Sequence, residues 1–254
     1  MQANGIELKT KEEIIKIRKS AQIVKKVLEK LKTIARAGIA TLEFDLVAME
    51  ELKKYGAKPA FLGYQGFPKS VCISINNEVV HGIPSDKRIL KNGDIVSIDF
   101  GVEYDGYFGD AALTVPVGKI SNTAKKLIDV TEKALYEGIK NAKVGNKLYD
   151  ISASIQEYVE KNGFSVVRDY VGHGIGKKLH EEPMVPNFGE KGTGPVLKEG
   201  MVFAIEPMVN EKGFEVKVLD NGWTVVTVDN GLSAHFEHTV AIVNGKARIL
   251  TEWE

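Results

Sequence analysis

The chain has 254 residues, of which 43% are apolar, and its 34 basic residues balance 34 acidic ones. This composition is typical of a globular protein that is long enough to bury a core. The zero net charge argues against a nucleic-acid partner, which normally requires a basic excess. Because the chain has no apolar run of about 18 residues and no signal-like start, we expect no membrane contact and a cytoplasmic location. The single cysteine, Cys72, cannot form an intrachain disulfide, so nothing requires an oxidising compartment.

Two helices are predicted near the start of the chain. Thr10 and Glu13 have the spacing of a capping box, and apolar residues then recur every three or four positions from 14 to 34. Gly38 follows as a stop signal. A second helix is predicted from about 41 to 56, and its expected buried residues are Leu46, Met49 and Leu52.

The rest of the chain alternates between strands and helices. Strands are predicted at 71–75, 94–100 and 107–115, and helices at 123–141 and 148–161. Mainly strands are expected after residue 165. The order of helices, strands, helices and strands predicts an α+β fold.

The sequence also repeats itself. A shift of 107 residues carries Leu-Lys-Asn-Gly at 90–93 onto Leu-Lys-Glu-Gly at 197–200, and Asp99 onto Glu206. The same shift matches two pairs of helix-ending glycines: Gly38 with Gly145, and Gly56 with Gly163. We interpret this as a duplicated α+β unit inside a single catalytic domain, 1–254, with pseudo-symmetric halves of about 10–118 and 119–250.

Two acidic residues are expected to converge on one ion. Asp99 ends an apolar strand, and a buried carboxylate without a partner costs several kcal/mol, so it needs a cation or donors. Asp105-Gly106 predicts a two-residue hairpin turn, which would pair Gly101 with Asp110. Asp110 is then the diagonal neighbour of Asp99, about 7–8 Å away at the backbone.

Further candidate ligands lie in the second half of the chain. His173 lies in a glycine-rich run that allows close backbone approach, and this run lacks the spacing and the following helix of a nucleotide-binding loop. Glu206 closes an apolar strand, and Glu237 is expected in the final strand, within 235–242. Alternation places His235 on the face of Glu237 and His238 on the opposite face, and we interpret both as structural.

Five residues therefore form an oxygen-rich set with one imidazole: Asp99, Asp110, His173, Glu206 and Glu237. The set is too hard for a thiolate-type zinc site and too rich in acids for a single facial-triad iron. Two divalent ions bridged by carboxylates would neutralise its charge. Such a pair is typical of hydrolases.

Two other histidines occupy matching contexts. His81 and His180 each begin a His-x-x-Pro motif that precedes a Leu-Lys-x-Gly segment. Histidines that flank metals can donate to an oxyanion and transfer the proton of a leaving amine. The alternative is a surface-loop histidine near a proline.

These motifs resemble those of the methionine aminopeptidase family, whose pita-bread fold is shared with aminopeptidase P, prolidase and creatinase. The resemblance extends from about 14 to 250, and its most specific segments are 81–84, 94–99, 107–110, 170–176, 180–183, 204–207 and 237–239. It implies a pita-bread α+β fold with an antiparallel sheet flanked by helices. It also implies a type I enzyme that removes the initiator methionine from nascent proteins by hydrolysing the first peptide bond.

The resemblance implies roles for individual residues. Two divalent ions (cobalt, manganese, iron or zinc) would be held by the five residues of the oxygen-rich set. Glu206 would help to activate the nucleophilic water, His180 would stabilise the tetrahedral intermediate, and His81 would contact the scissile amide and assist proton transfer. Besides these two histidines, the implied substrate-binding residues form an apolar pocket beside Leu179: Tyr64, Phe67, Cys72 and Trp223. The implied partners are nascent polypeptide N-termini, with transient ribosome contact and a monomeric state.

Two alternatives remain open at this stage. An Xaa-Pro aminopeptidase or prolidase would normally carry a large additional amino-terminal domain, for which the chain has no room. A non-catalytic pita-bread binding module would tend to lose metal ligands, whereas all five are present.

Overall fold

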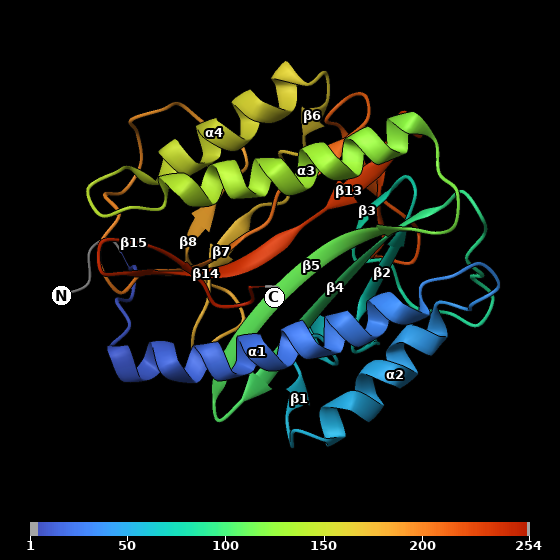
Figure 1. Ribbon diagram of the computed structural model, residues 1–254, viewed down its shortest axis with the longest axis horizontal. Coiled ribbons are helices and arrows are strands. Elements are labelled where there is room, and N and C mark those ends of the chain that lie inside the picture. The colour runs from blue at the N-terminus through green and yellow to red at the C-terminus, as the bar shows by residue number, and fades with distance from the viewer. Residues whose placement is uncertain (1–4, 253–254) are drawn as a thin grey trace.

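The computed structural model describes residues 5–252. Its four α-helices are α1 (Lys11–Ile34), α2 (Leu42–Lys53), α3 (Asn122–Asn141) and α4 (Leu148–Lys161). Figure 1 shows the α1–α2 pair along the lower part of the view and the α3–α4 pair along the upper part, with the long strands running between them. None of the helices within the described residues is long and apolar enough to cross a bilayer.

The start of α1 is as predicted. The Thr10 hydroxyl accepts a hydrogen bond from the Glu13 amide, and the Glu13 carboxylate accepts one from the Thr10 amide, which completes a capping box. The predicted apolar stripe is buried from Ile17 through Leu31. This stripe packs α1 against the sheet.

The predicted face of α2 is partly wrong. The helix ends at Lys53, and its apolar buried residues are Phe44, Ala48 and Leu52. Leu46 is 54% exposed. The stripe from Phe44 to Leu52 repeats every four residues, and Leu46 lies roughly 200° around the helix from Phe44, so it faces solvent.

The main sheet within residues 5–252 has nine strands, and their pairings are antiparallel. The order is β1 (Lys58–Pro59), β4 (Ile95–Tyr104), β5 (Tyr107–Pro116), β14 (Glu237–Val243), β9 (Val202–Ile205), β7 (Gly172–Gly174) and β8 (Glu181–Val185). In addition, β2 (Cys72–Ile75) pairs with β4, and β15 (Lys246–Ile249) pairs with β14. The predicted α+β class and helix-flanked antiparallel sheet are confirmed.

Two smaller sheets and a short 3-10 helix complete the fold. One sheet joins β13 (Ser233–His235), β10 (Met208–Asn210) and β6 (Ser165–Val166). The other joins β11 (Val216–Val218), β12 (Val225–Thr227) and β3 (Glu78–Val80). The 3-10 helix, η1, spans Tyr64–Gly66.

The β4–β5 hairpin has the predicted register. Gly101 pairs with Asp110, and both residues of the turn, Asp105 and Gly106, have positive φ as a two-residue hairpin requires. Along β4, Phe100 is buried in the main core beneath the helices. Asp99, the preceding residue, therefore points to the other face of the sheet.

Contacts at the two helix–strand junctions recur with the same 107-residue spacing. The isolated bridges are Ala40 with Ile89 and Lys147 with Val196. The matching backbone hydrogen bonds run from the Gly38 amide to the Leu90 carbonyl and from the Gly145 amide to the Leu197 carbonyl. The centre of the main sheet likewise consists of two strand pairs, β4–β5 from the first half of the chain and β14–β9 from the second, which meet where β5 pairs with β14.

Candidate active site

Neighbouring strands align three carboxylates around one small residue. Ala112 on β5 pairs with Asp99 on β4 and also with Glu237 on β14, so the two acids flank it in one row. Asp110 lies two residues before Ala112, and therefore on the same face of β5. Because the alanine side chain is short, the space above it is open to all three carboxylates.

The second half of the chain adds Glu206 and His173. Glu206 directly follows Ile205, the last residue of β9, and His173 on β7 pairs with Ala204 of the same strand. The Glu206 Oε1 atom lies 3.5 Å from His173 Nε2. Ligand atoms of Asp110, His173 and Glu237 all lie within 4.8 Å of one another. The structure thus brings all five candidate ligands to one cavity.

The glycine-rich run around His173 serves close strand packing. A Cβ atom on Gly172 would lie 2.3 Å from the Ala204 carbonyl oxygen, and one on Gly174 would lie 2.3 Å from the Glu182 carbonyl oxygen. Only glycine allows the neighbouring strands to approach β7 this closely. The run therefore fixes the position of His173 between two strands and does not form a nucleotide-binding loop.

Asp110 and Glu237 are buried, Asp99 and Glu206 are largely covered but partly exposed, and the four carboxylates repel one another. Burial raises the pKa of Asp99 to about 7, although nearby His235 lowers it, and the Glu206 charge raises it further. Burial also raises the pKa values of Asp110, Glu206 and Glu237 well above their usual range. These acids therefore need compensating positive charge to be ionised together at neutral pH.

Several candidate ligand atoms have no hydrogen-bond partner within the described residues. Among the described residues, Asp99 Oδ1, Asp110 Oδ1 and Glu237 Oε1 are buried without a hydrogen bond. The His173 Nδ1 atom lies 2.9 Å from the Gly174 carbonyl oxygen; its N–H donates there and leaves a lone pair on Nε2. This donor set fits divalent cations, which would satisfy the orphaned oxygens and the imidazole together.

An apolar wall borders the carboxylates. The cavity measures about 140 Å³, and the predicted pocket residues Tyr64, Phe67, Cys72 and Trp223 all line it together with Leu179. The Phe67 and Trp223 rings meet edge to face with centroids 5.2 Å apart. Phe61 and Gln65 also line the cavity and were not predicted. Their only sequence signal is proximity to Tyr64.

The two His-x-x-Pro histidines reach the same cavity. His180 Nδ1 lies 2.7 Å from the Tyr64 hydroxyl oxygen, and the His180 ring meets the His173 ring edge to face at 4.1 Å. Burial, with smaller contributions from neighbouring His235 and His180, lowers the pKa of His81 to about 4. His81 is therefore a neutral imidazole at neutral pH. Its φ of +60° is a left-handed conformation that histidine rarely adopts.

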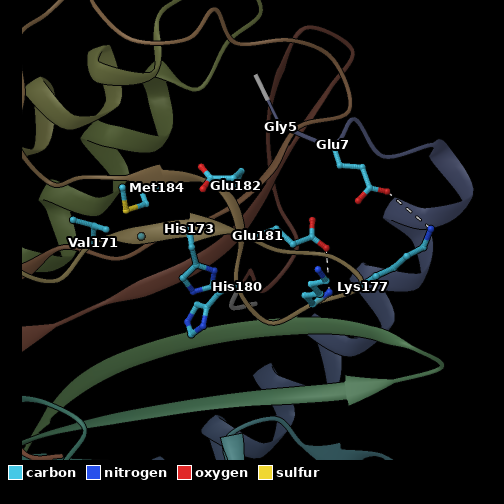
Figure 2. Close-up of a pocket in the computed structure, with 11 residues that line it drawn as sticks. Gly5, Glu7, Val171, His173, Lys177, His180, Glu181, Glu182 and Met184 are labelled. Atoms are coloured by element: carbon cyan, nitrogen blue, oxygen red, sulfur yellow. Dashed lines mark hydrogen bonds and ion pairs between the residues drawn. The ribbon is translucent and has the colours of Figure 1, made fainter. Parts of the chain in front are cut away.

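A second hollow of about 670 Å³ lies beside the β7–β8 hairpin. Figure 2 shows the imidazole rings of His173 and His180 on the opposite side of this hairpin from Glu182 and Met184. His173 and His180 line this hollow together with Lys177, and they also line the smaller cavity, so the two spaces adjoin at these histidines.

His235 was left out of the site by sequence reasoning, but the structure brings it to the metal-ligand candidates. It is 1% exposed, and its Nε2 atom lies 3.6 Å from Glu206 Oε2. The available signal was the predicted alternation that put His235 on the face of Glu237, although the structure divides the two residues between β13 and β14. His238, as expected, is oriented elsewhere, and its ring nitrogens approach Tyr136 and Thr251.

Residues 15–244 match metallopeptidase family M24. A methionine aminopeptidase of Clostridium perfringens is 56% identical over 244 residues, which cover 96% of this chain and 98% of that protein. Methionine aminopeptidase 1 of Bacillus subtilis is 53% identical over 243 residues, with 96% and 98% covered. These relatives confirm the resemblance expected from the motifs.

Solved structures agree. The methionine aminopeptidase of Thermotoga maritima superposes with a TM-score of 0.96 at 46% identity, covering 98% of this chain and 100% of that one. The prolidase of Pyrococcus furiosus gives 0.79 at 27% identity and is covered over only 66% of its length. The pita-bread fold is confirmed, and the prolidase alternative is not favoured. The chain belongs to metallopeptidase family M24.

Proposed function

We propose that this chain is a methionine aminopeptidase that removes the initiator methionine from nascent polypeptides. One observation carries the proposal: a single cavity contains four carboxylates and one imidazole that could hold metal, an apolar pocket, and two further histidines. Relatives that are more than half identical over nearly the whole chain are named methionine aminopeptidase. A non-catalytic binding module would have no use for buried carboxylates without partners.

We propose that Asp99, Asp110, His173, Glu206 and Glu237 hold two divalent ions drawn from cobalt, manganese, iron and zinc. Carboxylate oxygens with one imidazole suit all four metals. When bound, such ions supply Lewis acidity towards a carbonyl oxygen and lower the pKa of a water molecule. The unpartnered oxygens of Asp99, Asp110 and Glu237 support this assignment.

The histidines and Glu206 move protons in this proposal. If the Tyr64 hydroxyl donates to His180 Nδ1, the Nε2 atom of His180 carries the ring proton and donates to the oxygen that becomes negative. Glu206 accepts the proton of the attacking water at a carboxylate oxygen. His81, neutral at neutral pH, contacts the scissile amide and relays a proton towards the leaving amine.

The apolar wall selects the first side chain of the substrate. Tyr64, Phe67, Cys72 and Trp223 form a pocket with Leu179, and an unbranched apolar side chain such as methionine can bury its whole length there. The pocket adjoins the candidate metal ligands, so a side chain in it brings the first peptide bond to the acids.

Several features of the setting belong to the same proposal. The enzyme acts on nascent polypeptide N-termini in the cytoplasm, with transient ribosome contact. It is a monomer that binds neither nucleic acid nor a membrane. We also propose that the whole chain, 1–254, is one catalytic domain made of halves at about 10–118 and 119–250. The matched contacts at a spacing of 107 residues support the duplication.

The test is a metal-restoration assay. Metal-free protein is offered methionyl peptides and Xaa-Pro peptides, and then receives cobalt, manganese, iron or zinc separately. We expect no turnover without metal and release of methionine after restoration. Release of the residue before proline, with no release of methionine, would instead support the prolidase-like alternative. Activity that is independent of any divalent ion would contradict the proposal.

A further inference from the structure

Each carboxylate oxygen of Glu206 has an imidazole nitrogen beside it. Its Oε1 atom lies 3.5 Å from His173 Nε2, and its Oε2 atom lies 3.6 Å from His235 Nε2. The two histidines come from different strands, β7 and β13. The carboxylate therefore lies between imidazoles that two different strands supply.

The two imidazoles present different groups to Glu206. His173 donates from Nδ1 to the Gly174 carbonyl oxygen, so its Nε2 carries a lone pair. A lone pair on Nε2 and the facing oxygen Oε1 of Glu206 repel each other unless a cation lies between them. This side of the carboxylate is therefore suited to an ion shared with His173.

His235 differs from His173 because its Nε2 atom can present a proton to Glu206. It is 1% exposed, and its Nε2 atom has no hydrogen-bond partner among the described residues. A proton on this nitrogen would meet the Oε2 atom of Glu206, whereas a lone pair there would be repelled by the same oxygen. A buried polar nitrogen without a partner is unfavourable, which favours the tautomer whose Nε2–H can donate to this carboxylate.

We propose that His235 is a positioning residue for the metal centre: its Nε2–H faces Oε2 of Glu206 across 3.6 Å and closes into a hydrogen bond when the ligands hold metal, so that Oε1 is aimed at the ion shared with His173. This inference rests on the proposed metal-dependent function. His235 does not touch the substrate in this arrangement, and it acts through Glu206 alone. Loss of such an outer hydrogen bond to a ligand typically lowers metal affinity 10- to 100-fold.

The test is calorimetric titration of Co²⁺ into metal-free protein, with the visible absorption of Co²⁺ recorded in parallel. We expect His235→Leu to weaken one Co²⁺ site about 10- to 100-fold, and His235→Gln, which can still donate, to retain most of the affinity. In a Glu206→Gln background, His235→Leu should cause little further loss, because the group it positions has been changed. Additive losses in that double variant would overturn the proposal.

His238→Leu is the matched control, because it removes an equally buried imidazole three residues away whose ring approaches Tyr136 and Thr251. We expect it to lower stability without a comparable loss of Co²⁺ affinity. Equal losses in the two leucine variants, or unchanged affinity in His235→Leu, would overturn the role of His235. Failure of the unmodified protein to bind Co²⁺ would instead refute the proposed function, so the two failures are distinguishable.

Discussion

Lys9 and Glu181 form a buried ion pair that ties the start of the chain to the hairpin carrying His180. Lys9 Nζ lies 2.5 Å from Glu181 Oε2, and the two side chains are 2% and 11% exposed. The other oxygen of Glu181 accepts a hydrogen bond from the Lys178 amide. Glu181 directly follows His180, so this pair fixes the backbone next to a proposed catalytic residue.

Lys9→Met should destabilise the protein and reduce turnover. Removing one partner of a buried pair leaves an uncompensated charge and costs about 3–5 kcal/mol. Urea unfolding measures this loss, and kcat for a methionyl peptide reports the displaced His180. Lys25→Met is the control, because Lys25 is also buried but pairs at 3.9 Å with the half-exposed Glu29, far from the hairpin. Equal effects of the two substitutions on kcat would contradict the prediction.

Glu13 should contribute stability that depends on pH. Its hydrogen bond with Lys177, followed by that with the Thr10 amide, lowers its pKa from 4.5 to about 2. A carboxylate with a lowered pKa stabilises the fold fully above its unfolded pKa, and this stabilisation is lost as pH falls through the folded value. The difference in unfolding free energy between the unmodified protein and Glu13→Gln should thus shrink between pH 4.5 and 2. A difference that is constant over this range would refute the assignment.

Ala112→Val should impair metal binding more than folding. The added methyl groups enter the space between Asp99 and Glu237, both of which pair with Ala112 across the sheet. Overpacking of this kind costs about 1–3 kcal/mol, and a strand tolerates valine well. Calorimetric metal titration should show a large loss of affinity. Ala241→Val, in the same sheet but packed in a separate apolar cluster, should leave metal affinity unchanged.

Trp223→Ala should weaken selection of methionine. Trp223 contributes one aromatic wall of the pocket and contacts Phe67 edge to face. Loss of part of the burial of a methionine side chain costs about 1–2 kcal/mol, which corresponds to a loss of roughly 5- to 30-fold in kcat/KM. The measurement is kcat/KM of the variant and of the unmodified protein for three peptides, which begin with methionine, norleucine or alanine. A uniform loss for all three peptides would indicate damage to the catalytic centre instead of the pocket.

Sequence alone determined the local features and predicted most of the residues that the structure brings to the cavity. The capping box at Thr10 and Glu13, the hairpin register that pairs Gly101 with Asp110, and the five candidate ligands follow from signals within a few residues. Such signals act through neighbouring backbone groups, so they survive in any tertiary context. The shift of 107 residues likewise needed only the order of residues.

Only the tertiary structure decided which groups meet across the fold. Two contacts join segments that are distant in the chain: the ion pair of Lys9 with Glu181 and the approach of His235 to Glu206. The buried face of α2, which excludes Leu46, depends on the elements packed against that helix. Side-chain alternation gives the face of a residue, but not the partner strand that faces it. That partner is set by sheet order and register, which place Ala112 between Asp99 and Glu237.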